Sequence, residues 1–529
     1  MATEYDAVIV GAGHNGLVCA AYLARAGRSV LVLERRQVLG GCAVTEEFTS
    51  GYRCSATFPS AETFEPTIID ELKLADHGLR LLEPGGILVP RAGDEPLFLP
   101  PPSVGEAGET ISTESAGLSA TDAAALIEFD AFLRRLADAI GPIWSKPLPA
   151  LEPKGLSGFL ELLGAGWLLR RLGKSDLREA MRFLPMPLAD VLDERFESAA
   201  LKAAIAASGI TGSWLGPRSP GSALNLLLHR LGRRRGALGY PQLVAHGSGA
   251  LTEALGQAAQ AAGATLRTGA TVTRIRVAKG SAAGVTLASG ETIAARTVIS
   301  NADPKTTLLR LVEPLHLDPS VLVAFRAIRS RSTVAIVKLA LDRLPGFAGT
   351  VGEPGRLAGR IQIGASLDEL EQAFDATKYG ELPQRPYLDI TIPSITDPSL
   401  APSGKHVLSA WVQFPPYHLR GKDWSEARDG LADIVVRRIE EHAPGFAAGI
   451  EARDVLTPRD LEERFAVGEG CLYHVEPALD QCLYMRPAPR WGRYRMPIAG
   501  LYLCGSGTHG GGGLTGLAGR NAARRVLSD

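Results

Sequence analysis

The feature that most constrains the fold of this chain is a glycine-rich turn close to its N-terminus. A short apolar run at 7–10 leads directly into Gly11, Gly13 and Gly16, which stand in the spacing G-x-G-x-x-G, and an alanine-rich segment at 17–26 predicts a helix. In such a turn the first glycine allows a tight bend, the second lets the backbone approach a pyrophosphate, and the third lets the helix lie close to the sheet. This order predicts a dinucleotide site at a helix N-terminus.

A second apolar run, 29–33, follows the helix and ends in Glu34. A carboxylate at this place accepts hydrogen bonds from ribose hydroxyls and disfavours the 2′-phosphate of NADP. These residues therefore leave NAD and FAD open. Gly40 and Gly41 predict a second close approach of the backbone to the same ligand.

The charge balance bounds the partners of the protein. The 529 residues include 56 basic and 57 acidic side chains, so we expect no binding to nucleic acid and favour a small-molecule ligand. A chain of this length and composition is typical of a globular protein with two or more domains. Because the first strand begins near residue 5, we expect no targeting segment before it and a cytoplasmic protein.

The six cysteines show neither a C-x-x-C pair nor the spacing of a metal site, and we predict no metal. Cys42 lies next to the glycine pair but lacks the nearby partner cysteine that a disulfide reductase needs. We expect most of the cysteines to be buried as small apolar side chains. They are Cys19, Cys42, Cys54, Cys471, Cys482 and Cys504.

Periodicity along the rest of the chain predicts two units that alternate in sequence. Ser119 and Asp122 form an approximate capping box for a helix. Predicted helices cover 120–140 and 425–442, and predicted strands cover 297–300, 334–341, 387–392 and 406–414. The nucleotide-binding domain is expected to combine 1–75, 240–304 and 490–529, and the substrate domain to combine 76–239 and 305–489.

The segment 156–174 is strongly apolar, with its large side chains on one helical stripe. It is too short, and too interrupted by Glu161, to span a bilayer. We favour a core helix of the second domain, and the alternative is an interfacial helix that dips into lipid. The basic run at 229–236 could contact anionic headgroups, although such runs are more often solvated surface.

A second glycine-rich turn closes the chain. The strand at 501–504 runs into Gly505, Gly507 and Gly510, again in the spacing G-x-G-x-x-G, and a helix is predicted from about Leu514. Too few residues follow for a second βαβ unit, so this strand is expected in the same sheet as the first one. A helix N-terminus here would favour the anion that a reduced flavin carries at N1 and the C2 carbonyl. This favours FAD over NAD.

Three motifs together resemble one known family. VGAGHNGLVCAAYLARAG near the start, NADP after a strand, and LYLCGSGTHGGGGLTGLAGRNAA near the end are similar to the phytoene desaturase and carotenoid isomerase family of FAD-dependent oxidoreductases. The region at 456–491 looks most like the subgroup of pyridine nucleotide-disulfide oxidoreductase domain-containing protein 2. The resemblance implies an α/β fold in which a glutathione-reductase-like (Rossmann-type) FAD-binding domain is interleaved with an α+β substrate domain.

The resemblance also implies which residues bind the one FAD. The adenosine-pyrophosphate half would be held by Gly11, Gly13, Gly16, Glu34, Arg35, Gly40 and Gly41, and Val272 would meet the adenine. The ribityl and ring end would be lined by Gly505, Ser506, Gly513, Leu514 and Thr515.

The chemistry expected of such a site is hydride transfer from a saturated C–C or C–N bond to the flavin, followed by reoxidation by oxygen or a quinone. The substrate is expected to be a hydrophobic, isoprenoid-like or acyl-like molecule. His509 is the predicted catalytic residue, with a purely structural role as the alternative, and we interpret His474, Glu476 and Arg53 as structural. Two other functions stay open: a flavin amine oxidase, and a flavin-bound protein that docks a partner or a membrane. The sequence leaves the oligomeric state open.

Overall fold

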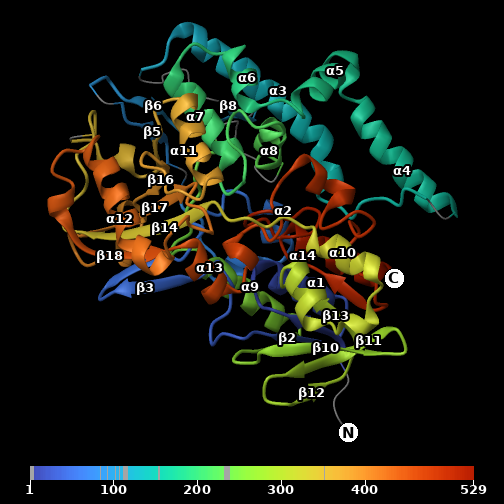
Figure 1. The fold of residues 1–529 in the computed structure, drawn as a ribbon. Helices are drawn as coiled ribbons and strands as arrows, with labels where there is room; N and C mark the ends of the chain where they lie inside the picture. Colours follow the sequence, from blue (N-terminus) through green and yellow to red (C-terminus); the bar gives the residue numbers. More distant parts are fainter. Residues whose placement is uncertain are drawn as a thin grey trace.

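A five-stranded parallel sheet joins both ends of the chain to its middle (Figure 1). The computed structural model describes residues 5–83, 85–91, 93–101, 103–105, 108–110, 117–152, 155–231, 239–350 and 352–529. The order of this sheet is β19-β13-β1-β2-β9, with β1 at Tyr5–Val10, β2 at Val30–Leu33, β9 at Thr265–Arg267, β13 at Ala295–Ser300 and β19 at Leu501–Leu503. The prediction that the first and last glycine-rich turns follow strands of one sheet is confirmed.

Both faces of this sheet are buried at 7–10 of β1 and along β2, which explains why these segments read as continuous apolar runs. Ile9 and Val32 face a core shared with α1 (His14–Arg25) and α9 (Ser248–Ala261), and α14 (Leu517–Ser528) packs against α1. Val8 and Leu31 face the opposite way, toward a three-stranded antiparallel sheet. That sheet consists of β10 (Val272–Ala278), β11 (Ser281–Leu287) and β12 (Thr292–Ile293), which follow one another as an antiparallel meander.

A second, seven-stranded sheet has the order β18-β14-β17-β16-β15-β5-β6. Its strands are β5 (Ile87–Val89), β6 (Leu97–Leu99), β14 (Val334–Leu341), β15 (Arg360–Ile363), β16 (Tyr387–Thr391), β17 (His406–Gln413) and β18 (Ile450–Leu456). Val337 and Leu339 face α12 (Trp424–Glu440), whereas Ile336 and Trp411 on the other face share a core with Phe58 of the first unit. The three strands predicted between 334 and 414 are confirmed.

Helices form a third layer beside the second sheet (Figure 1). They are α3 (Ala120–Trp144), α4 (Gly155–Arg170), α5 (Gly173–Phe183), α6 (Leu188–Asp193), α7 (Ala199–Ile210) and α8 (Ser222–Leu228). The Ser119 side chain caps α3 by accepting a hydrogen bond from the Asp122 amide at 3.1 Å. The Asp122 carboxylate does not complete a capping box, because it accepts from the amides of Glu197 and Ser198 and so ties α3 to the start of α7.

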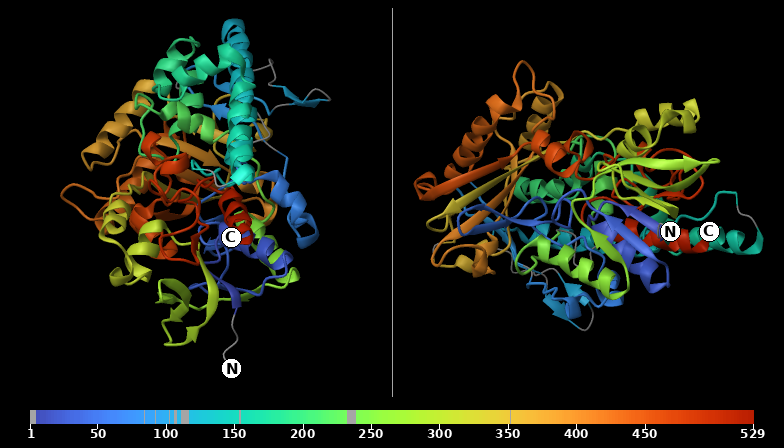
Figure 2. Two further views of the ribbon diagram at one scale, coloured as in Figure 1. Left: turned by 90° about the vertical axis from the view of Figure 1, so that its right-hand side faces the viewer. Right: turned by 90° about the horizontal axis from the view of Figure 1, so that it is seen from below.

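The prediction that the segment at 156–174 is a core helix is wrong. Helix α4 runs out at the edge of the molecule, as Figures 1 and 2 show. Five of its large apolar side chains are between 49% and 74% exposed, and they are Leu156, Phe159, Leu160, Leu163 and Trp167. No helix in the described ranges is long and apolar enough to cross a membrane. Of the basic run at 229–236, residues 232–236 lie outside the described residues.

Shorter elements complete the fold. The strands are β3 (Thr45–Thr49), β4 (Tyr52–Ser55), β7 (Ser103–Gly105) and β8 (Gly108–Thr110). The helices are α2 (Pro66–Glu71), α10 (Pro319–Arg326), α11 (Leu367–Lys378) and α13 (Pro458–Phe465).

Candidate functional site

A cavity of about 1090 Å³ opens at the carboxyl ends of β1 and β2, and we call it the cofactor cavity. Ligands of open parallel sheets bind at this edge. Most of the predicted FAD-binding residues line it: Gly11, Gly13, Glu34, Arg35, Gly40, Gly41, Val272 and Ser506. The fold therefore brings the first glycine-rich turn, the start of β10 and the closing glycine-rich turn to the cofactor cavity.

The glycines around this cavity stand where the backbone conformation or close neighbours leave no room for a side chain. Gly11 has a φ of +95°, a conformation that L side chains rarely adopt. A Cβ atom on Gly13 would lie 2.7 Å from Asn301 Nδ2, and one on Gly41 would lie 3.2 Å from the Gly13 Cα. Gly16 lies outside the cavity wall, and a Cβ there would stand 2.3 Å from the Gly11 carbonyl oxygen. Gly16 therefore shapes the turn instead of contacting the ligand.

Glu34 links the first glycine-rich turn to the segment that follows β2. Its carboxylate accepts hydrogen bonds from the amides of Ala12 and Arg36, each at 2.9 Å, and the side chain is buried. A carboxylate has about four acceptor positions, so two of them stay available for ribose hydroxyls. Arg35 and Arg36 beside it add positive charge to the wall. The donor and acceptor set fits an anionic dinucleotide.

Several polar residues that the sequence did not assign to the ligand also line this cavity, among them His14, Asn301 and His474, the last of which the sequence indicates to be structural. Among the described residues, His14 Nε2 and His474 Nδ1 are buried without a hydrogen-bond partner, as expected of groups that meet a ligand. Burial, together with a smaller effect of the neighbouring His474, lowers the pKa of His14 to about 3, so the ring is neutral at pH 7. His14 and Asn301 stand within the family motifs, where their positions could have marked them, whereas the sequence around His474 indicates only a structural role.

The two glycine-rich turns are joined by Asn15. Its Nδ2 donates to Ser506 Oγ at 3.2 Å, and its Oδ1 accepts from the Gly519 amide at 3.3 Å. Helix α14 begins at Leu517, three residues later than predicted, because the chain from Gly510 to Gly516 stays in a turn. The predicted helix N-terminus near Gly513 is therefore absent from the turn itself.

A second cavity of about 570 Å³ lies on the other side of the closing turn. Its walls come from the end of α3, from α8, from the segment 473–486 and from the turn, where Gly511, Gly512 and Thr515 line it. Gly505, Gly513 and Leu514 line neither cavity: a Cβ on Gly505 would lie 2.7 Å from the Asn301 carbonyl oxygen, and Leu514 is fully buried. The closing turn is thus the partition between a cofactor cavity and this second cavity.

His509 lies behind the partition. The ring is fully buried, its Nε2 is 3.1 Å from the Ile143 carbonyl oxygen, and it packs edge-on against Trp144 at 5.0 Å. Burial lowers its pKa to about 4. It lines neither cavity, so its placement supports the structural alternative and not the predicted catalytic role.

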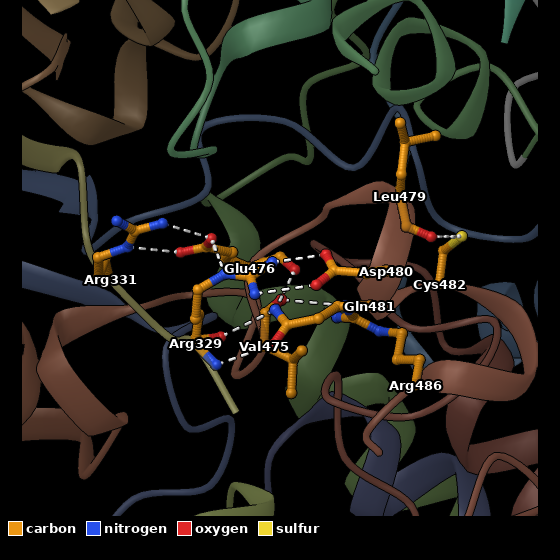
Figure 3. Close-up of polar contacts among 9 residues, drawn as sticks. All are labelled: Arg329, Arg331, Val475, Glu476, Leu479, Asp480, Gln481, Cys482 and Arg486. Carbon is orange, nitrogen blue, oxygen red and sulfur yellow. Dashed lines mark hydrogen bonds and ion pairs between the residues drawn. The ribbon is translucent and has the colours of Figure 1, made fainter. Parts of the chain in front are cut away.

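The wall of the second cavity is braced by ion pairs (Figure 3). Glu476 is buried and pairs with Arg329 at 2.9 Å and with Arg331 at 2.7 Å, and Asp480 also pairs with Arg329. The structural interpretation of Glu476 is confirmed. Arg53 is exposed on β4.

Arg486 anchors the same wall from inside. Its guanidinium donates to the carbonyl oxygens of Tyr473, Val475, Ser506 and Thr508, at distances from 2.8 to 3.1 Å. Burial lowers its pKa to about 10, which leaves it charged at pH 7. One buried cation therefore fixes both the 473–486 segment and the start of the closing turn.

All six cysteines are free thiols. Cys42 lines the cofactor cavity, and burial raises the pKa of its thiol to about 12, so it is protonated at pH 7. A protonated thiol without a partner does not carry out disulfide exchange.

Comparisons with known proteins agree with this geometry. Residues 160–527 match the family model of flavin-containing amine oxidoreductases, and residues 9–66 match an NAD(P)-binding Rossmann-like domain. Pyridine nucleotide-disulfide oxidoreductase domain-containing protein 2 of Rattus norvegicus is 38% identical, over 99% of this chain and 94% of the relative. A limonene dehydrogenase polypeptide of Castellaniella defragrans is 27% identical, over 99% and 95%.

A phytoene desaturase of Cereibacter sphaeroides is 28% identical over 52% of this chain and 51% of its own length. Among solved structures, an oxidoreductase from Methanosarcina mazei superposes with a TM-score of 0.60 at 17% identity, covering 99% of this chain and 100% of the other, which shows the shared fold. The chain belongs to the flavin-containing amine oxidoreductase family and is an FAD-dependent oxidoreductase related to the phytoene desaturases.

Proposed function

We propose that the protein removes hydride from a hydrophobic, isoprenoid-like or acyl-like substrate, as a desaturase or dehydrogenase does, with oxygen or a quinone as the final electron acceptor. The observation that carries this proposal is the second cavity, which shares the closing turn with the cofactor cavity and has Trp144, Leu228 and Pro477 in its walls. Apolar walls with few polar groups are typical of sites for hydrophobic ligands. The likeness to the limonene dehydrogenase polypeptide supports the same substrate class.

The proposal includes a division of the chain. A glutathione-reductase-like FAD unit would comprise 1–75, 240–304 and 490–529, and an α+β substrate unit would comprise 76–239 and 305–489. The membership of β1, β2, β9, β13 and β19 in one sheet supports the first unit, and the seven-stranded sheet with its helices supports the second.

The bound FAD would supply the hydride acceptor. The chain's own residues would hold it: the glycines admit the pyrophosphate, Glu34 accepts from the ribose, and His14 and His474 offer neutral ring nitrogens to polar atoms of the ligand. The second cavity would then orient the substrate and exclude water beside the Gly511–Gly512 turn.

The test is anaerobic mixing of the purified yellow protein with a cyclic terpene, with a long-chain acyl ester and with primary amines. We expect the visible flavin band to bleach with the terpene or the ester. Bleaching by amines alone would assign the amine oxidase function, and no bleaching with any of them would leave the docking function.

The amine oxidase alternative has one observation in its favour, the match of residues 160–527 to the flavin-containing amine oxidoreductase model. The second cavity argues against it. None of the described residues that line this cavity is acidic, and the buried Arg486 cation lies in its wall. An ammonium group would therefore have no counter-ion there.

We propose that α4 rests on the surface of an anionic membrane. Between 155 and 169 Glu161 is the sole charged residue, and the exposed large apolar side chains lie along one stripe of the helix. Exposed Arg170, Arg171 and Lys174 follow, and the Arg171 guanidinium lies 5.0 Å from the centroid of the Trp167 ring. An apolar helix that ends in an aromatic residue and basic residues is typical of an interfacial helix on anionic lipid.

The link between α3 and α4 lies against the wall of the second cavity. Tyr484 donates through its hydroxyl to the Pro149 carbonyl at 3.0 Å, and Arg493 donates to the Leu148 carbonyl at 2.9 Å. A helix on lipid would therefore place this cavity near the membrane.

Replacing Leu163 and Trp167 by glutamate is expected to reduce the fraction of protein that floats with anionic vesicles roughly tenfold, because two apolar side chains that would be buried in lipid are exchanged for charges. The measurement is flotation with vesicles of phosphatidylglycerol and phosphatidylcholine. The matched control carries Leu315→Glu and Val323→Glu, which change two similarly exposed apolar side chains far along the chain. Equal flotation of both variants and the unchanged protein would contradict the proposal.

A further inference from the structure

Three polar side chains in the wall of the second cavity lie close together. Asn225 and His229 stand one helical turn apart on α8 and just after it, and the amide of His229 donates to the carbonyl of Asn225 at 3.1 Å. Residues at this spacing share a helix face. Tyr473 lies opposite, with its hydroxyl 3.5 Å from His229 Nε2. All three line the cavity.

Asn225 offers a hydrogen-bond acceptor to this cavity. Its side chain is 2% exposed, and its Nδ2 donates to the Gly209 carbonyl, which fixes the orientation of the amide. Its Oδ1 has no hydrogen-bond partner within the described residues. A buried carbonyl oxygen on a cavity wall calls for a donor from whatever fills the cavity.

Two aromatic residues flank Asn225 in the cavity. His229 Nδ1 lies 2.7 Å from the Ser208 carbonyl oxygen, and because a carbonyl only accepts, Nδ1 carries the hydrogen. The Tyr473 hydroxyl lies 3.2 Å from the Thr211 carbonyl oxygen and 3.5 Å from His229 Nε2. Asn225 Oδ1 therefore supplies the acceptor that a donating ligand group would meet on this wall.

The charge of the cavity restricts that donor further. Four of the five N–H groups of Arg486 donate to backbone carbonyls, and the residue adds a positive charge to the wall of the cavity. An ammonium group is disfavoured by this charge, and a carboxylate has no hydrogen to donate to Asn225 Oδ1. A hydrocarbon leaves Asn225 Oδ1 without a donor. The group that satisfies all of these conditions is a neutral hydroxyl.

We propose that the second cavity binds a mainly apolar alcohol, whose hydroxyl donates to Asn225 Oδ1 beside His229 and Tyr473. The proposal rests on the proposed function, in that the alcohol is the class of substrate that this cavity would present to the flavin. Asn225 is then the residue that selects an alcohol over a hydrocarbon of similar shape.

Two isomeric ligands test this assignment on the flavin-loaded protein. Octanol has a hydroxyl, whereas heptyl methyl ether has the same atoms but no donor. We expect octanol to bind about tenfold more tightly by calorimetric titration, because one net hydrogen bond to a buried acceptor is worth about this ratio. Octylamine and octanoate should bind more weakly than octanol. Equal affinities of octanol and the ether, or tighter binding of either charged ligand, would overturn the proposal without any variant.

Single substitutions test which residue causes the preference for octanol over heptyl methyl ether. Asn225→Leu is expected to bring the two affinities to within about twofold, because the acceptor is lost. Tyr473→Phe is expected to weaken octanol binding by a smaller factor, and its matched control is Tyr494→Phe, which also removes a buried hydroxyl that donates to a backbone carbonyl but lies outside the cavity. An unchanged preference in Asn225→Leu that still binds flavin would refute the role of Asn225.

Binding and turnover separate the two proposals. A clear preference for octanol in a protein whose flavin no terpene, ester or alcohol bleaches would contradict the proposed function and leave the hydroxyl site standing. Bleaching by terpenes together with equal affinities for octanol and the ether would support the proposed function and contradict the hydroxyl site.

Discussion

Gly16→Ala is expected to purify with little or no FAD. A Cβ atom at this position would stand 2.3 Å from the Gly11 carbonyl oxygen, which belongs to the backbone of the turn and has no side-chain freedom to yield. The helix must then move away from the turn or the turn must open, and overpacking of this kind costs about 1–3 kcal/mol. Because the strain falls on the pyrophosphate-binding turn, we expect the affinity for FAD to fall by about tenfold to a hundredfold.

The measurement is the ratio of flavin to protein absorbance after dialysis against a range of FAD concentrations. Gly430→Ala is the control, since a Cβ atom added to this helical glycine of α12 would have no heavy atom within 4 Å among the described residues. The control should retain FAD and gain about 1 kcal/mol of helix stability. Full FAD content in Gly16→Ala would show that the turn has more room than the structure gives it.

Arg486→Met is expected to destabilise the protein by at least about 3 kcal/mol, because four buried carbonyl oxygens each lose a donor, and of these the Thr508 carbonyl keeps another donor, the Gly511 amide. Methionine matches much of the volume, so the loss reports on hydrogen bonds more than on packing. Arg486→Lys should recover only part of the stability, since one ammonium cannot reach four carbonyls arranged around a guanidinium.

Urea unfolding followed by far-ultraviolet circular dichroism measures this effect. Arg182→Met is the control, because Arg182 pairs with Glu194 on the surface and its loss should leave the unfolding midpoint unchanged. A midpoint for Arg486→Met that matches the control would mean that water replaces the guanidinium in the wall.

The sheets are predictable from the sequence because their signal is local. Strands such as β1 and β14 are apolar except for Asp6 and Lys338, and the turn after β1 is marked by Gly11, Gly13 and Gly16. Most of the residues predicted for FAD line the cofactor cavity for the same reason.

The features that escaped prediction depend on contacts between distant segments. His229 and Tyr473 meet across 244 positions of sequence, and no spacing rule connects them. His509 stands next to the closing turn in sequence, yet its ring turns toward Ile143 on α3. The apolar sequence of α4 would suit a helix buried in the protein core as well as a helix that rests on lipid. The exposure of its side chains in the folded protein is what distinguishes the two.

The place of β19 in the parallel sheet bears on how this protein matures. β19 pairs with β13 and is the last strand of the sheet along the chain, while β1 on the other side of β13 is the first. The sheet therefore cannot be completed during most of translation, and its closure brings together residues almost a full chain length apart. A nascent chain would pass through a long stage with an open edge at β13, and a protein shortened before residue 501 would keep that edge for good. Because Ser506 follows β19, the wall of the cofactor cavity is also completed only when this strand joins the sheet.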